Sequence, residues 1–498
     1  MSKAISPPGL RLRPFPFFDF QGLDVSRDRT GLDTGKRQAL IGCENAHCDW
    51  RGQIVKDPGV NRRASPNAVI EHVDFYGRGL VAWAQRDGSG QITLNSDRSH
   101  SLPDVFPAGS VVSSTTFNKK LHFAAKGQAI RTYDGAVWTR NSSALQAGPA
   151  NVAASQRRLI CSGIPNKPTE IHFSRADNET AMPEDEPDGS TDVLRGSYLD
   201  ISNLIGTADE IVGHGPFETN RLAIFTRDQT LVYIINPDLT KWSIDERANV
   251  KVGCISHRTI RQANADLLFC ARSGVYSLRR SVDNAIQLYS IPLSEKIDLL
   301  YRELIARTDD TARISAVWDQ DAGQYHIFFP HGAATNVATR LTWTQHPTDP
   351  ERSKWSTGTF LNARCGAFLG GEMVFGTPGG LFDQRKIEDD TATLHPESTV
   401  LTPVLWHGSI NEIKESYNLV IHATGQGTIE VEAFNEEGRE LDSLTVTIDE
   451  PQDDVFPDLP LSRQYTRKFE HRYRGVQLRF TLKGKGLCRI IGFAINVR

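Results

Sequence analysis

Residues 222–235 read LAIFTRDQTLVYII, and residues 266–278 read DLLFCARSGVYSL. In each stretch a polar turn separates short apolar runs that are rich in β-branched and aromatic residues, which is the pattern of a β-hairpin with a buried face. One hairpin follows the other along the chain. Because so narrow a sheet is not stable alone, successive hairpins must bury their faces on one another, as the blades of a β-propeller do.

The same hairpin pattern recurs on both sides of this central stretch. It precedes it at residues 69–94, 111–138 and 158–174, and follows it at residues 314–355 and 367–382. The Asp134-Gly135 dipeptide before Trp138 is a strong signal for a hairpin turn. Counting the hairpins predicts an all-β fold built on a propeller of roughly six to eight blades.

Residues 293–305 carry the one convincing helical pattern in the sequence. Ile297, Leu300 and Leu304 share one face, and Ser294 is placed to cap the N-terminus, with Glu295 in the first turn. We expect this helix to pack on the outside of a sheet.

The two ends of the chain differ from the middle. Near the start, prolines frame a cluster of phenylalanines, Phe15, Phe17, Phe18 and Phe20. This composition predicts an extended arm with apolar anchors. Toward the C-terminus the strands are longer and alternate strictly, which predicts a small β-sandwich platform domain. The predicted division is an arm at 1–64, the propeller body at 65–395 and the sandwich at 396–498.

The overall charge argues against general binding of nucleic acid. The chain has 498 residues, a net charge of −4 and a pI near 6.4, so it lacks the basic surplus on which attraction to phosphate depends. No apolar run is long enough for a signal sequence at the start or for a membrane span elsewhere, which predicts a soluble protein that is not secreted by that route. The seven cysteines are an odd number and lie mostly in apolar runs, so we expect reduced thiols made in a cytosol.

Two local clusters have a functional and a structural interpretation. Cys43 and Cys48 resemble half of a zinc site, but no second Cys/His pair stands at the required spacing, which favours structural thiols. Between residues 177 and 197, five carboxylates gather around two prolines. That loop is either a cation or partner site or a solvated acidic insertion that is dispensable for folding, and the second interpretation is favoured. Its carboxylates are Glu179, Glu184, Asp185, Glu186 and Asp188.

The sequence contains none of the common catalytic or phosphate-binding motifs. A propeller glycosidase remains an alternative, because paired carboxylates on one loop would suffice, and Asp319 and Asp321 stand close together. These two residues also occupy a hairpin turn, where Asp is favoured for its own backbone hydrogen bonding. The sequence therefore predicts no enzyme, no cofactor and no metal site.

Charge is segregated near the C-terminus, where residues 430–458 are mostly acidic and residues 463–498 mostly basic. These segments either compensate each other within one fold or form complementary surfaces between subunits, where such patches set register and orientation. The candidate subunit-interface residues are Arg467, Lys468, Arg472, Arg474, Glu436, Glu437, Asp453 and Asp454.

Most of the chain also resembles a known family, the β-propeller tail proteins of short-tailed bacteriophages, called nozzle, tail-tube hub or packaged-DNA stabilisation proteins. The resemblance lies in short stretches of sequence spread along the chain, and one of them is the predicted helix that begins at Leu293-Ser294. Its other stretches are LIGCEN at 40–45, GQIVKDPG at 52–59, NRLAIF at 220–225, VGCIS at 252–256, LLFCARSGVY at 267–276, PVLWHGS at 403–409, YTRKF at 465–469 and RGVQL at 474–478.

The resemblance implies a structural protein of the virion tail, made in the host cytoplasm. It implies a ring of six copies that continues the DNA channel below the portal and adaptor, retains packaged DNA and conducts it during ejection. The implied partners are further copies of the chain, the adaptor or portal proteins above, tail fibre, spike or needle proteins, and passing double-stranded DNA without sequence recognition. The alternatives are a carbohydrate-binding or carbohydrate-cleaving propeller and a propeller scaffold for protein interactions.

Overall fold

The computed structural model describes residues 13–26, 39–64, 68–77, 79–98, 105–140, 148–186, 192–206, 208–236, 238–279, 291–332, 337–349, 352–384, 392–407, 411–449, 463–486 and 488–497. The chain divides into two compact units, each described by itself below. The propeller unit comprises Arg62–Leu341 and Leu361–Gln384, and the terminal unit comprises Met1–Asn61, Thr342–Phe360 and Arg385–Arg498.

The propeller unit is built from small antiparallel sheets, six of which are separate from one another. Their strands are β6 (Val69–Tyr76), β7 (Leu80–Arg86) and β8 (Ile92–Ser96); β9 (Val112–Phe117), β10 (Lys120–Ala125), β11 (Gln128–Tyr133) and β12 (Trp138–Arg140); β13 (Asn151–Ser155), β14 (Arg158–Ser162), β15 (Glu170–Phe173) and β16 (Ser197–Asp200); β17 (Ile211–Phe217), β18 (Arg221–Thr226), β19 (Thr230–Ile234) and β20 (Ser243–Ile244); β21 (Arg261–Ala263), β22 (Asp266–Ala271) and β23 (Gly274–Ser277); and β28 (Cys365–Leu369), β29 (Glu372–Thr377) and β30 (Gly380–Gln384) with β5 (Val60–Ala64). Strands β24 (Ser315–Asp319), β25 (Gln324–His331) and β26 (Val337–Thr344) belong to a larger sheet.

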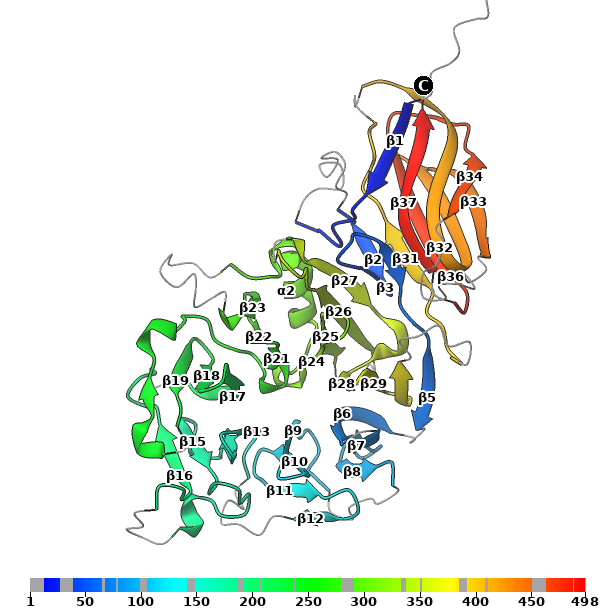
Figure 1. The fold of residues 1–498 in the computed structure, drawn as a ribbon. Coiled ribbons are helices and arrows are strands. Elements are labelled where there is room, and N and C mark those ends of the chain that lie inside the picture. The colour runs from blue at the N-terminus through cyan, green and yellow to red at the C-terminus, as the bar shows by residue number, and fades with distance from the viewer. Residues whose placement is uncertain are drawn as a thin grey trace, which may run out of the picture. The chain divides into compact units, whose positions relative to one another are not determined.

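The first strands of successive sheets lie next to one another and close a ring (Figure 1). The order is β6, β9, β13, β17, β21, β24 and β28, and β28 lies against β6 again. Six separate sheets and the β24–β26 set therefore surround one axis, as the blades of a propeller do. This confirms the predicted all-β propeller, with a number of blades in the expected range.

The central hairpin shows why the apolar runs are continuous. In β18 and β19, Leu222 and Ile224 pair with Tyr233 and Leu231, and all four side chains pack with those of the preceding sheet. The alternate residues, among them Phe225 and Val232, pack with the following sheet. Because successive side chains of a strand point to opposite faces, a strand covered on both faces needs apolar residues at every position.

The predicted helix is present, but its cap is not. It begins as a 3-10 turn, η7 (Glu295–Ile297), and continues as α2 (Asp298–Ala306), with Ile297, Tyr301 and Leu304 buried. As expected, α2 lies against strands, β23 and β25. The Ser294 hydroxyl makes no capping bond to the helix and instead accepts the amide of Val275 at 3.0 Å. The expected Ser294 cap is therefore wrong, because the hydroxyl is used to anchor the preceding sheet.

Other single turns of 3-10 helix join the strands. They are η2 (Pro183–Asp185), η3 (Leu239–Lys241), η4 (Glu246–Ala248), η5 (His257–Thr259), η8 (Thr311–Arg313) and η10 (Phe360–Asn362).

The terminal unit has a β-sandwich character that depends on one long strand, β32 (Lys414–Asn435). Its first half pairs with β37 and β34, and its second half pairs with β36 and β33. The change of partners falls at Gly425 and Gly427, whose φ angles are 98° and 145°. A side chain at Gly427 would meet the carbonyl oxygen of Lys483 at 2.5 Å, so only glycine fits the bend. The other strands are β1 (Arg13–Phe18), β2 (Gly42–Glu44), β3 (Ala46–Cys48), β4 (Ile54–Lys56), β27 (Lys354–Gly358), β31 (Ser398–Leu401), β33 (Glu440–Asp449), β34 (Arg463–Lys468), β35 (Arg472–Tyr473), β36 (Val476–Lys483) and β37 (Cys488–Val497).

The N-terminal segment is part of this unit. Strand β1 pairs along its whole length with β37, and β4 pairs with β37 as well. The Phe17 and Phe20 rings lie 4.8 and 6.0 Å from the Phe493 ring, so two of the four predicted apolar anchors are core side chains, whereas Phe15 is half-buried and Phe18 is exposed. The structure also groups Thr342–Phe360 with the chain ends, a division that differs from boundaries at 64 and 395. Strand patterns in a sequence identify strands and not their distant partners, which explains the difference.

Candidate functional site

The first strand of the basic segment predicted as an interface, β34, forms an edge of the terminal unit, whereas β36 and β37 of the same segment lie inside the sheet. Strand β34 pairs with β32, with Arg467 opposite Leu419 and Lys468 opposite Asn418. The side chains of Arg463, Arg467 and Lys468 are exposed. Charged side chains on an edge strand also prevent pairing with a strand of another molecule. The exposed charges of β34 therefore have a structural role even without a binding partner.

Much of the opposite charge in the two C-terminal segments is paired within the chain. Three contacts join the acidic segment to the basic one, which confirms compensation within one fold for the residues involved, and Lys468 and Arg472 pair with carboxylates outside residues 430–458. The pairs are Lys483 with Glu430 at 2.8 Å, Arg479 with Glu432 at 3.1 Å, Lys468 with Glu470 at 2.7 Å, Arg472 with Glu415 at 3.2 Å and His471 with Asp442 at 3.0 Å. Pairs as exposed as these contribute roughly 0–1 kcal/mol each.

Of the remaining candidate residues, some form hydrogen bonds within the chain and others are exposed to solvent. Glu436 is half-buried and accepts the amide of Gly475 at 3.3 Å, so it belongs to the turn after β32. Glu437 is exposed, and Arg467 reaches the carbonyl oxygen of Thr445 at 3.4 Å. Asp453 and Asp454 lie outside the described residues.

Three arginines stand out from this comparison. Arg463, Arg467 and Arg474 are exposed and have no carboxylate partner among the residues that the structure describes. The structure brings Arg467 and Arg463 together on β34, while Arg474 follows β35. Among the described residues, these three arginines have no carboxylate that neutralises them.

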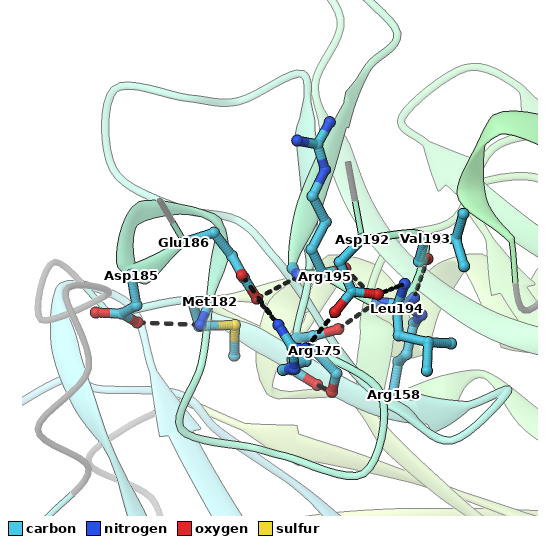
Figure 2. Close-up of polar contacts among 11 residues, drawn as sticks. Arg158, Arg175, Met182, Asp185, Glu186, Asp192, Val193, Leu194 and Arg195 are labelled. Carbon is cyan, nitrogen blue, oxygen red and sulfur yellow. Dashed lines mark hydrogen bonds and ion pairs between the residues drawn. The ribbon is translucent and has the colours of Figure 1, made fainter. Parts of the chain in front are cut away.

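In its described residues, 177–186 and 192–197, the acidic loop is only partly solvated: Glu184 and Asp185 are exposed, whereas Glu186 is enclosed (Figure 2). Glu186 accepts the amide of Gly196 at 2.8 Å and lies 3.2 Å from a guanidinium nitrogen of Arg175, which also bonds Asp192. Asp185 accepts the amide of Met182 at 3.0 Å, and the Met182 side chain is buried. The described part of the loop therefore folds around Arg175 and the buried Met182, while Asp188 lies outside the described residues. That residues 177–188 are dispensable for folding stays a prediction.

Buried Arg158 is the centre of this arrangement. Its guanidinium donates to the carbonyl oxygens of Ser174 and Arg195, both at 2.7 Å, and of Val193 at 3.1 Å, so it joins β14 to the returning loop. Burial lowers the pKa of Arg158, and its three carbonyl acceptors stabilise the guanidinium there. The sequence signal that was missed is the presence of arginines at 158, 175 and 195 beside the carboxylates.

Glu179, at the start of the loop, is also engaged. It accepts hydrogen bonds from Lys120 at 2.7 Å and from Asn118 at 2.8 Å. Burial disfavours its charge, but these two hydrogen bonds outweigh burial and hold the pKa of Glu179 below its usual value.

The residues considered for chemistry have structural roles. Asp319 accepts the amides of Asp321 and Ala322, both at 2.9 Å, which confirms the turn interpretation. Cys43 and Cys48 are buried and free, as are the other five cysteines. Within the described part of the chain, no group of three His, Cys, Asp or Glu side chains could hold a metal ion. In the same part, no helix is long and apolar enough to cross a membrane.

Comparison with known proteins adds a likeness of fold. No protein-family model matches the chain, and no curated protein matches it. Among solved structures it is similar to the Pan2 WD40 domain of Neurospora crassa, at 9% identity over 67% of this chain and 96% of that one, with a TM-score of 0.34. It is also similar to the computationally designed Ika8 protein, at 10% identity over 66% of this chain and 99% of that one, with a TM-score of 0.36. A third is the SapL1 lectin in complex with alpha methyl fucoside, at 12% identity over 59% of this chain and 92% of that one, with a TM-score of 0.28. At these values the likenesses say nothing about function.

Proposed function

We propose that this chain is a structural protein of the tail of a short-tailed bacteriophage, without catalytic activity, and that it works as a ring of identical subunits. The ring would extend the DNA channel below the portal and adaptor, and would retain and then conduct the packaged DNA. The proposal starts from the resemblance in sequence texture. The single structural observation that supports it is the set of exposed arginines in the terminal unit, Arg463, Arg467 and Arg474, which lack a described carboxylate partner.

The ring follows from the size of DNA. The strands of one propeller converge on a central channel that is too narrow for duplex DNA, because the major groove of DNA alone is about 12 Å wide. A conduit for duplex DNA must therefore lie between subunits. In a cyclic ring, one surface of each subunit meets a different surface of its neighbour, so an exposed basic edge needs an acidic partner surface on the next copy.

The test is a matched pair of charge reversals in the full-length protein. Arg467→Glu with Arg474→Glu changes arginines that lack a described carboxylate partner, whereas Lys468→Glu with Arg472→Glu changes cations already paired with Glu470 and Glu415 of the same chain. We expect the first variant to lower the fraction of rings at least tenfold in sedimentation and negative-stain images. The second variant should have a smaller effect, and high salt should weaken the wild-type ring in part.

Two results would count against this function. One is a wild-type protein that stays monomeric at high concentration and low salt. The other is a first variant that forms rings as well as the wild type does and still assembles into complete, DNA-retaining tails. Binding to a glycan array by such a monomer would favour the carbohydrate-binding alternative instead.

A further inference from the structure

A group of arginines surrounds one buried glutamate in the propeller unit. Glu71, on β6, is 3.1 Å from Nε of Arg86, 3.5 Å from a terminal nitrogen of Arg313 and 3.6 Å from a terminal nitrogen of Arg364. Arg258 donates to the carbonyl oxygen of the same Glu71 at 2.6 Å. This group was not predicted from the sequence, because its members come from distant parts of the chain.

The five residues lie on several blades. Arg86 is on β7, next to the strand of Glu71, while Arg258 lies in η5, just before β21. Arg313 ends η8, just before β24, and Arg364 immediately precedes β28. Since β21, β24, β28 and β6 are neighbours in the ring, the arginines join the last blades to the first one.

Among the described residues, positive charges outnumber negative ones around Glu71. The guanidinium groups of Arg86, Arg313 and Arg364 lie within 4 Å of its carboxylate, and Arg258 bonds its backbone carbonyl oxygen. A second carboxylate, that of Asp310, is 48% exposed and 3.8 Å from Nε of Arg313. Burial lowers the pKa of Arg258 to about 10, and it lowers the pKa of Arg364 as well, although Glu71 acts in the opposite direction on both. Two neighbouring arginines, Arg86 and Arg313, add to the unfavourable charge at Arg364.

Arg364 carries the strongest indication of a ligand. Its side chain is 1% exposed, and none of its three guanidinium nitrogens has a hydrogen-bond acceptor among the described residues. Nε of Arg258 also lacks an acceptor there. Buried guanidinium donors need acceptors, and a cluster with surplus positive charge favours acceptors that are negative.

We propose that the Arg86, Arg258, Arg313 and Arg364 group binds a small oxyanion of the phosphate or sulfate type. Such an anion offers several acceptor oxygens to the three guanidinium nitrogens of Arg364 and adds negative charge beside Glu71. It would tie the blade that begins with β28 to the blade that begins with β6. The bound anion would therefore stabilise the closed ring of blades, a role that is independent of the function of the terminal unit.

The first experiment measures phosphate binding to the full-length wild-type protein. Calorimetry and thermal unfolding are carried out with sodium phosphate against sodium chloride at equal ionic strength. At about a hundredfold excess over the dissociation constant, phosphate should raise the unfolding midpoint by roughly 5 °C more than chloride does. An equal effect of both salts would mean charge screening only, and would overturn the proposal.

Variants then locate the site. Arg364→Gln should abolish the phosphate-specific shift and weaken binding at least tenfold, whereas Arg157→Gln, at an exposed ion pair with Asp177 in the same unit, should leave both unchanged. Glu71→Gln removes the competing carboxylate and should tighten phosphate binding by roughly tenfold or more. A merely structural role of the cluster predicts no such gain, so unchanged or weaker binding by Glu71→Gln would also overturn the proposal. If Arg364→Gln does not fold, the wild-type calorimetry and Glu71→Gln still decide the question.

Discussion

Two sets of charged side chains, one in each unit, differ in exposure, although the terminal unit also buries Lys56 and Lys354 and the propeller unit also has the exposed pair of Arg157 and Asp177. In the propeller unit, Arg158 is 1% exposed and Glu71 is 5% exposed, and each is enclosed by hydrogen bonds or opposite charges. In the terminal unit, Lys468 and Arg472 are paired as well, but their side chains are 75% and 76% exposed. The same residue types therefore have different physical effects in the two sets.

This difference indicates what each set of charges is for. A charge that is removed from water must be matched, so its loss leaves an unmatched group behind and destabilises the fold. A charge in water is screened and contributes little to stability, but it remains available to a partner surface. We therefore expect substitutions in the propeller to act on folding, and substitutions on β34 and β35 to act on assembly.

The largest effect is expected at Arg158, with its neighbour as the control. Arg158→Met removes hydrogen bonds to three carbonyl groups and should lower the free energy of unfolding by about 3 kcal/mol. Arg157→Met, next to it, loses only an exposed pair with Asp177 and should leave the free energy of unfolding almost unchanged. Urea unfolding of both variants measures the difference. Equal stabilities would mean that the loop at 177–197 is an independent, solvated insertion after all.

An intermediate effect is expected from the buried histidine His214. It lies 2.9 Å from the Ser162 hydroxyl and 3.2 Å from the carbonyl oxygen of Ile160, and burial lowers its pKa to about 4 from 6.5. The unfolded chain therefore binds a proton more readily than the native state does, so the contribution to stability is full above pH 6.5 and is lost as the pH falls toward 4.

Between pH 6.5 and 5.5 this loss should be about 1 kcal/mol for one histidine. Hydrogen exchange of peptides from β17 and β18, followed across this range, reports it in the propeller unit. His214→Gln should reduce the pH dependence, and His471→Gln, in the terminal unit, should not. If the protection factors, which are corrected for the pH dependence of intrinsic exchange, stayed constant across this range, His214 would be hydrated in solution.

The smallest effect is expected at the exposed pairs of the terminal unit. Lys468→Gln and Glu470→Gln, singly and together, should each change the free energy of unfolding by less than about 0.5 kcal/mol, with a coupling energy in the same range. A coupling above about 1 kcal/mol would show that this edge is structural, and would weaken the contrast between the two sets of charges.

The fold class could be predicted from the sequence, and much of the site could not. Hairpins such as residues 222–235 are local, because their turn and both strands are contiguous, so pattern and turn chemistry suffice to identify them. The arginine group around Glu71 could not be predicted, because its residues range from 71 to 364 in the sequence and meet only when the ring of blades closes. The charge pattern near the C-terminus predicted a surface, but not which of its members pair within the chain.

What the sequence by itself determined is the all-β character, the repeated hairpins, the buried thiols and the turn role of Asp319, since each depends on periodicity or on neighbouring residues. Only the tertiary structure decided that β1 pairs with β37, that β32 continues through Gly425 and Gly427, and that Arg158 binds the loop across from β14. The physical reason is that a strand's edge and a buried charge can be satisfied by partners from any part of the chain. The composition shows that possible partners are present in the chain. Which of them come into contact depends on the tertiary fold.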